Sequence, residues 1–147
     1  MPDLVFADTN VLVYARDAGQ TEKQPRAAAW MRYLWTTRSG RLSPQVLHEF
    51  YVTVTSKLRP GMAPADARRE VRELYAWRPV VLGLPEMEGA WVVQDRFGLS
   101  WWDALIVSAA RVAGCRLLLT EDLQDGQQLD DVRVVNPFAH EPPVTPA

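Results

Sequence analysis

Apolar positions along the chain follow two periodicities, which together predict short strands alternating with amphipathic helices. Uninterrupted apolar runs of three or four residues predict buried strands, whereas apolar residues three and four positions apart predict helices. The predicted strands are 4–7, 80–82, 116–119 and 132–135, and the predicted helices are 11–15, 25–37, 43–58, 65–77, 86–97 and 99–114. Such alternation indicates an α/β fold with a mainly parallel sheet.

The length of the chain and its apolar content indicate how many domains it forms. A chain of 147 residues with 48% hydrophobic residues suits one domain with a single core. We expect this domain to span residues 1–138 and to be followed by a flexible, proline-containing tail, 139–147. No apolar run approaches the roughly 20 residues needed to cross a bilayer, and the N-terminus lacks the order of a secretory signal. We therefore expect a cytoplasmic protein that does not contact a membrane.

The charge of the chain does not favour a nucleic-acid binder. The net charge is −2 and the pI is about 5.7, whereas nucleic-acid binders usually have a basic patch or a basic pI. Against this, 14 of the 16 basic residues are arginine, which binds phosphate in a bidentate manner. Arg68, Arg69 and Arg72 alternate with acidic residues on one predicted helix, so a solvated, salt-bridged surface explains them equally well. The single cysteine, Cys115, lies beside apolar helix residues and is expected to be a structural thiol.

Four acidic residues stand at the ends of predicted elements. Asp8 directly follows the first strand, and Asp122 follows the strand that ends at residue 119. Asp103 lies in the first turn of the helix at 99–114, and Glu49 lies at the edge of an apolar helix stripe.

Each of these acids also has an ordinary explanation. Asp8 or Thr9 can cap the following helix, and Ser100 with Asp103 matches a helix capping box. Glu49 can simply be solvated. Asp122 or Asp125 can form a turn before Gly126.

Taken together, the four acids predict a metal site. Parallel strands bring their carboxyl ends to one edge of a sheet, and a following helix begins at that edge, so Asp8, Asp103 and Asp122 are expected to converge there. Glu49, at the edge of its helix stripe, is expected to point toward the same cavity as Asp8. Converging carboxylates repel one another unless they are protonated or bind a cation, and hard oxygen ligands suit Mg²⁺ or Mn²⁺. A divalent ion at such a site favours hydrolysis of a phosphodiester.

The same residues resemble, in order and spacing, the successive motifs of PIN-domain ribonucleases. The nearest group is the VapC-type toxins of bacterial toxin–antitoxin pairs. The resemblance covers about residues 3 to 138 and rests on these segments: Asp8-Thr9-Asn10, Glu49, Trp102-Asp103-Ala104 and Leu118-Leu119-Thr120-Glu121-Asp122. It implies a compact three-layer α/β/α domain with Mg²⁺- or Mn²⁺-dependent endoribonuclease activity on RNA. It also implies a homodimer and an antitoxin protein that blocks the site.

The resemblance also assigns roles by position. Asp8, Glu49, Asp103 and Asp122 would form the catalytic quartet, and the metal would be held by all of them except Glu49. Thr120 would orient the last acid, and Asn10 or Thr9 would support the first. Many relatives carry an aromatic residue three positions after the last acid, where this chain has Asp125. The role of Asp125 is therefore open between a further metal ligand and a turn residue.

Other interpretations of these residues are also available. The aromatic residues Tyr14, Trp101 and Trp102 suit either stacking of unpaired bases or packing in the core. Aspartyl-phosphate phosphatases need a second acid two residues after the first, where this chain has Asn10. Receiver domains need a lysine after a late strand, but the only lysines are residues 23 and 57. The remaining alternative is a catalytically inactive PIN-like module that binds RNA or a protein.

Overall fold

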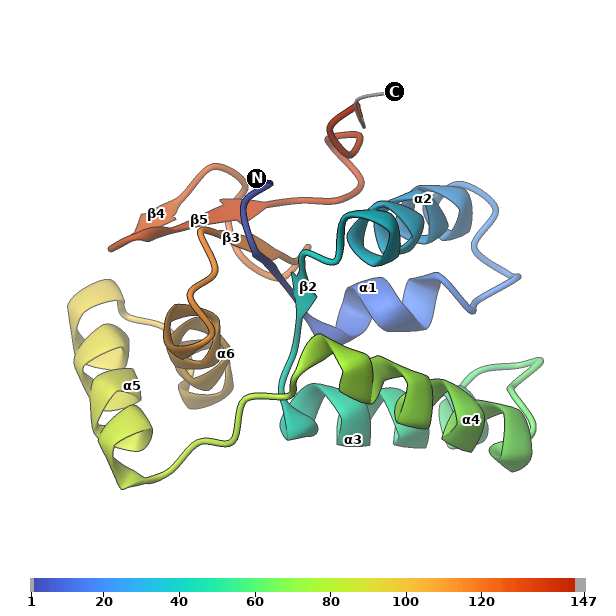
Figure 1. The fold of residues 1–147 in the computed structure, drawn as a ribbon, viewed down its shortest axis with the longest axis horizontal. Helices are drawn as coiled ribbons and strands as arrows, with labels where there is room; N and C mark the ends of the chain where they lie inside the picture. The colour runs from blue at the N-terminus through green and yellow to red at the C-terminus, as the bar shows by residue number, and fades with distance from the viewer. Residues whose placement is uncertain (1, 145–147) are drawn as a thin grey trace.

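The fold was analysed in a computed structural model, which describes residues 2–144. A five-stranded sheet with the order β2-β1-β3-β5-β4 forms its centre (Figure 1). The pairs β1–β2, β1–β3 and β3–β5 are parallel, and only β4–β5 is antiparallel. The strands are β1 (Val5–Ala7), β2 (Gly40–Arg41), β3 (Leu117–Leu119), β4 (Gln128–Leu129) and β5 (Val132–Val135). The predicted α/β class with a mainly parallel sheet is confirmed.

Helices cover both faces of this sheet. The helices are α1 (Thr9–Tyr14), α2 (Lys23–Thr37), α3 (Pro44–Val52), α4 (Pro64–Leu74), α5 (Leu84–Phe97) and α6 (Trp101–Val112). A π-helical turn, η1 (Thr53–Lys57), extends α3, and a 3₁₀ turn, η2 (Tyr75–Trp77), extends α4. Figure 1 shows α5 and α6 on one side of the sheet and α1 to α4 on the other. The expected three-layer α/β/α arrangement is therefore confirmed.

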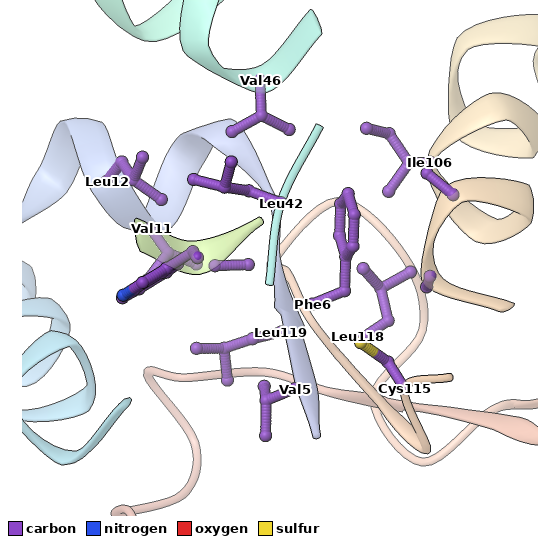
Figure 2. Packing of buried hydrophobic residues seen from close by; sticks show 14 of the residues in the cluster. Val5, Phe6, Val11, Leu12, Leu42, Val46, Ile106, Cys115, Leu118 and Leu119 are labelled. Atoms are coloured by element: carbon purple, nitrogen blue, oxygen red, sulfur yellow. The ribbon is translucent and has the colours of Figure 1, made fainter. Parts of the chain in front are cut away.

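The central strands are apolar throughout because both faces of the sheet are covered. Every residue of β1 is buried, and Phe6 of β1 lies in register with Leu118 of β3. Figure 2 shows Phe6 and Leu118 on the side of Ile106 of α6, whereas Val5 and Leu119 point to the opposite side. Alternate residues of each strand thus belong to the two halves of one core.

Local signals in the sequence set several helix boundaries correctly. The Ser43 hydroxyl accepts a hydrogen bond from the backbone N–H of Val46, and Pro44 occupies the first turn of α3. Gly98 ends α5 with a φ of 67°, in the left-handed region that glycine adopts without strain. Cys115 is buried in the core, where burial raises the pKa of its thiol to about 12.

The predicted strand at 80–82 is wrong. This segment belongs to no strand or helix, and Val81 is 77% exposed. Its backbone hydrogen bond with the sheet region runs from the N–H of Val80 to the carbonyl of Leu42, just beyond β2. The apolar triplet therefore connects α4 to α5, and three apolar residues alone do not distinguish such a connection from a buried strand.

Two strands were not predicted, because β2 and β4 are each only two residues long and have no apolar run. Gly40 of β2 is required by packing: a Cβ atom there would lie 2.8 Å from ring atoms of Trp77. None of the helices within residues 2–144 combines the length and apolarity that a membrane span requires.

The predicted tail lies partly outside the described residues, which end at residue 144. Its first part contacts the domain. The indole N–H of Trp30 donates to the backbone carbonyl of His140 at 2.9 Å, and the His140 ring lies 2.7 Å from a carboxylate oxygen of Asp125. The division into a domain and a flexible tail remains a prediction.

Candidate active site

Asp8 and Thr120 begin the site because they follow two neighbouring strands in register. Ala7 of β1 pairs with Leu119 of β3, so the next residue of each chain segment lies at the same sheet edge. The Thr120 hydroxyl donates to Oδ2 of Asp8 at 2.9 Å. Asp8 is only 7% exposed, and its Oδ1 accepts the backbone N–H of Thr9 at 2.8 Å. Asp8 therefore caps α1 with one oxygen and faces the sheet edge with the other.

Asn10 connects the first and last acids of the predicted quartet. Its Nδ2 lies 3.4 Å from Oδ2 of Asp8 and 3.2 Å from Oδ2 of Asp122. The same nitrogen lies 3.1 Å from the Thr120 hydroxyl oxygen, which also accepts the backbone N–H of Asp122 at 3.1 Å. The two aspartates thus share the Asn10 amide and the Thr120 hydroxyl, which Asp122 contacts through its backbone; among residues 2–144 they share no cationic side chain.

Glu49 reaches this site from α3. Its Oε2 accepts the Thr9 hydroxyl at 2.7 Å, and its Oε1 accepts the side-chain amide of Gln45 at 3.2 Å. The Gln45 contact joins residues one helical turn apart, so it fixes the glutamate along its own helix. Thr9 therefore positions Glu49 with its side chain, whereas it contacts Asp8 only through its backbone.

Asp103 enters from the start of α6. Its backbone N–H donates to the Ser100 hydroxyl at 3.2 Å, so Ser100 caps the helix. The capping box is only half formed, because within residues 2–144 the Asp103 carboxylate makes no hydrogen bond or ion pair. Its negative charge is close enough to Asp122 to raise the pKa of that residue.

The acids form one electrostatic cluster. Burial, with smaller contributions from the charges of Asp122 and Glu49, raises the pKa of Asp8 from 3.8 to about 6, although hydrogen bonds from Thr9 and Thr120 oppose this rise. Burial is also the main reason that the pKa of Asp122 is raised, with contributions from three neighbouring acids. In the described part of the chain, no lysine or arginine forms an ion pair with any member of the quartet.

The donor chemistry of this cluster fits a hard divalent cation. It offers carboxylate oxygens, and within residues 2–144 none of the four carboxylates has a lysine or arginine partner, so a bound cation would relieve their repulsion. The side chains do not yet enclose an ion: within residues 2–144, no three or more acidic, histidine or cysteine side chains are arranged to hold one. Binding would require the carboxylates to rotate toward a common point.

Asp125 makes different contacts from the quartet. Its Oδ1 accepts the backbone N–H of Asn136 at 2.9 Å, and its Oδ2 contacts the ring of His140. The Asn136 hydrogen bond is the main cause that lowers the pKa of Asp125, followed by the contact with His140. These contacts hold the loop after β3 against the segment after β5, as a turn residue would.

A lysine beside the site, Lys23, makes contacts that were not predicted from the sequence. Nζ of Lys23 lies 2.8 Å from Oε2 of Glu121 and stands over the rings of Tyr14 and Phe138, at 4.7 and 5.1 Å from their centres. The backbone N–H of Glu121 donates to Oδ1 of Asn10 at 3.4 Å. Lys23 and Glu121 are 98 residues apart, and no local pattern in the sequence joins them.

The aromatic stacking candidates differ in their surroundings. Tyr14 packs edge-on against Phe138 and beneath Lys23. Trp101 is half-buried and stacks on Trp91 with 6.2 Å between ring centres. Trp102, which precedes Asp103, is 63% exposed.

The fold and the site together define an α/β/α domain with a carboxylate cluster at the carboxyl ends of two neighbouring parallel strands. The chain belongs to the PIN domain family, whose model matches residues 5–132. This match confirms the family that the motifs indicated.

Two solved structures are similar in fold along nearly their whole length. A chain of a toxin–antitoxin complex from Klebsiella pneumoniae is 19% identical, with a TM-score of 0.63; the match covers 94% of this chain and 98% of that chain. A chain of FitAcB from Neisseria gonorrhoeae is 17% identical, with a TM-score of 0.62; the match covers 93% of this chain and 100% of that chain. Among functionally curated proteins, none matches this chain.

Proposed function

We propose that this protein is a Mg²⁺- or Mn²⁺-dependent endoribonuclease and the VapC-type toxin of a toxin–antitoxin pair. The observation that carries the proposal is the clustering of Asp8, Glu49, Asp103 and Asp122, which come from four separate segments and have no lysine or arginine partner within residues 2–144. PIN domains are generally nucleases, and the match to this family supports hydrolysis of a phosphodiester.

In this proposal, Asp8, Asp103 and Asp122 would hold the divalent ion. The ion would neutralise charge on the phosphodiester and make a water more acidic. Asn10 and Thr120 keep the first and last aspartates in a fixed relation through the hydrogen bonds they share. Glu49, which Thr9 and Gln45 orient, is the exposed carboxylate that accepts the proton of the attacking water.

The proposed partners follow from the toxin assignment. The similar chain from Klebsiella pneumoniae belongs to a toxin–antitoxin complex, which supports an antitoxin protein as a partner here. We further propose an RNA substrate, a homodimer and a cytoplasmic location.

The test is cleavage of structured and unstructured RNA with Mg²⁺ or Mn²⁺, with and without EDTA. We expect EDTA to abolish cleavage and restored Mn²⁺ to recover it. Asp103→Asn should lower the cleavage rate at least ~100-fold, whereas Asp3→Asn should leave it unchanged, because Asp3 is exposed and precedes β1, at the end of that strand opposite Asp8. Cleavage that persists in both EDTA and Asp103→Asn would contradict the metal mechanism.

A second candidate is an inactive PIN-like module that binds RNA or a protein. It is favoured by the absence, within residues 2–144, of three acidic side chains already arranged around one point. This candidate predicts no cleavage under any of these conditions and no Mn²⁺ binding by calorimetry. Mn²⁺ binding by wild type that weakens in Asp103→Asn would exclude it.

A further inference from the structure

The ammonium group of Lys23 is held in place beside the acid cluster. Its Nζ donates to Oε2 of Glu121 at 2.8 Å and lies 3.5 Å from the Tyr14 hydroxyl oxygen. It also stands over the rings of Tyr14 and Phe138, and a cation over an aromatic ring gains further attraction. Because Glu121 directly precedes Asp122, these contacts place a positive charge next to the candidate metal site.

This ammonium group retains the capacity to bind an anion. A lysine has three N–H donors, and among residues 2–144 only Glu121 and Tyr14 accept from Lys23. The Lys23 side chain is 38% exposed, so solvent reaches it. The hydrogen bond with Glu121 is the main cause that raises the pKa of Lys23, which therefore stays charged at neutral pH. One donor of a permanent cation is thus left for a ligand.

The ion pair between Lys23 and Glu121 is not needed to orient the acids. Among the described residues, Asn10 contacts Glu121 only through the backbone N–H of the glutamate. Asp122 is held by the Asn10 amide and, through its own backbone, by the Thr120 hydroxyl. The hydrogen bonds that orient Asp122 therefore include neither charged side chain. A partly exposed ion pair also adds little stability, so the pair has no evident structural task at the site.

A positive charge at this position would offset the repulsion between the site and RNA. The quartet and Glu121 are all acidic, and RNA carries a negative phosphate at every nucleotide. A divalent ion on the quartet would attract the phosphate that is cleaved, but the cluster would still repel the phosphates on either side of it. Of the lysine and arginine ion pairs within residues 2–144, only that of Lys23 reaches a residue next to a quartet member.

We propose that Lys23 is a substrate-binding residue that contacts the RNA phosphate next to the scissile one, and that Glu121 moderates its charge. The inference rests on the proposed nuclease function and extends its substrate site. Lysine binds phosphate as a point charge, so the contact should raise affinity for RNA of any sequence and should not select bases. Glu121 competes with the phosphate for the ammonium group, so removal of the Glu121 charge should strengthen RNA binding.

Two neutralising substitutions with opposite expected effects test the proposal. The binding of a fluorescent single-stranded RNA is measured by anisotropy in EDTA, which prevents metal-dependent cleavage. Lys23→Met keeps an aliphatic stem over the rings but removes the charge. Its RNA dissociation constant should rise at least ~10-fold, and the slope of log affinity against log salt should become shallower by about 0.7. Glu121→Gln should lower the dissociation constant about 2- to 5-fold.

Matched variants separate this contact from a general effect of charge. Lys57→Met makes the same substitution at the other lysine, which is exposed and forms no ion pair within residues 2–144. It should change the RNA dissociation constant less than about twofold. Lys23→Arg keeps the positive charge and should bind RNA within about threefold of wild type. Circular dichroism checks that every variant folds.

Mn²⁺ binding and cleavage kinetics separate substrate binding from a positioning role. If the pair only positioned Asp122, both Lys23→Met and Glu121→Gln would weaken Mn²⁺ binding in calorimetry. We expect Lys23→Met to keep Mn²⁺ affinity within about threefold of wild type or to raise it, because a nearby positive charge is lost. In Mn²⁺, its KM for RNA should rise at least ~10-fold while kcat stays within about threefold.

The outcomes distinguish this inference from the nuclease proposal. Equal RNA affinity in wild type and Lys23→Met would overturn the inference, as would a wild type that binds no RNA. Weaker Mn²⁺ binding in both Lys23→Met and Glu121→Gln would assign the pair a positioning role instead. Metal-dependent cleavage with an unchanged KM in Lys23→Met would leave the nuclease standing without this contact. RNA binding that depends on Lys23 in a protein that cleaves no RNA would contradict the nuclease and support the contact.

Discussion

Asp8→Asn should stabilise the metal-free protein at mildly alkaline pH, although it removes a residue of the candidate site. Burial raises the pKa of Asp8 from 3.8 to about 6, so folding penalises its charged form. A shift of about two pKa units corresponds to about 3 kcal/mol of unfolding free energy when the group is fully ionised. Asparagine carries no charge and avoids this penalty.

The sign of the pH dependence follows from the two pKa values of Asp8. Between pH 3.8 and about 6, the unfolded chain has lost the Asp8 proton while the folded protein still holds it. The free energy of unfolding of wild type therefore falls as pH rises through this window and then levels off. The stability of Asp8→Asn relative to wild type should increase by about 3 kcal/mol from acid to alkaline pH.

Asp8→Asn also removes a hydrogen-bond acceptor, and this lowers the free energy of unfolding by the same amount at every pH. The two oxygens of Asp8 accept hydrogen bonds from the Thr9 N–H and the Thr120 hydroxyl, and an amide keeps only one acceptor, which costs about 1 kcal/mol. Relative to wild type, the variant should therefore be about 1 kcal/mol less stable in acid and about 2 kcal/mol more stable at alkaline pH.

Urea unfolding in EDTA across this pH range measures the effect. Asp125→Asn is the matched control, because its hydrogen bonds lower the pKa of Asp125 and its relative stability should change with pH in the opposite direction. Added Mn²⁺ should then stabilise wild type more than Asp8→Asn, since an ion that binds only the folded state raises its stability. If the stability of Asp8→Asn relative to wild type is the same at every pH, burial does not penalise the Asp8 charge and the reasoning fails.

Three further substitutions test the site and the packing. Asn10→Ala removes the amide shared by Asp8 and Asp122 and should weaken Mn²⁺ binding about 10- to 100-fold by calorimetry; unchanged affinity would mean that the amide does not position the aspartates. Gly40→Ala should cost about 1–3 kcal/mol in urea unfolding, because its Cβ would lie 2.8 Å from the Trp77 ring. Gly89→Ala, whose Cβ would be 3.6 Å from the Ser108 hydroxyl within α5, should instead gain up to about 1 kcal/mol; equal effects of the two would refute the packing argument.

The parts of the fold that were predictable are those in which burial imposes a pattern on the sequence. β1 is buried and β3 and β5 are mostly buried, so they appear as largely apolar runs, and the helices appear through their apolar spacing. β2 and β4 are too short to carry a pattern, and they are strands only because a neighbouring strand pairs with them. The segment 80–82 is the converse case: its apolar residues suggest a strand, but no neighbour pairs with it as one.

In the candidate site, the positions of two acids were predictable from the sequence, but the contacts that orient them were not. Asp8 and Asp122 were placed by position, because residues that follow parallel strands meet at one sheet edge. The contacts that orient them were not predictable, since the hydrogen bond between Thr9 and Glu49 spans 40 residues and that between Asn10 and Asp122 spans 112. Asp125 shows the limit of positional reasoning: it is three residues from Asp122, yet its contacts are with Asn136 and His140.

Capping and participation in the site are compatible in this protein, although the sequence suggests them as alternatives. Asp8 caps α1 with Oδ1 and leaves Oδ2 to Thr120 and the sheet edge. At α6, Ser100 supplies the cap, which leaves the Asp103 carboxylate without a hydrogen bond among residues 2–144. The positive end of a helix dipole favours a nearby carboxylate, so both helix starts offset part of the repulsion among the acids. The signals that begin these helices therefore also hold negative charge at the edge where a cation would bind.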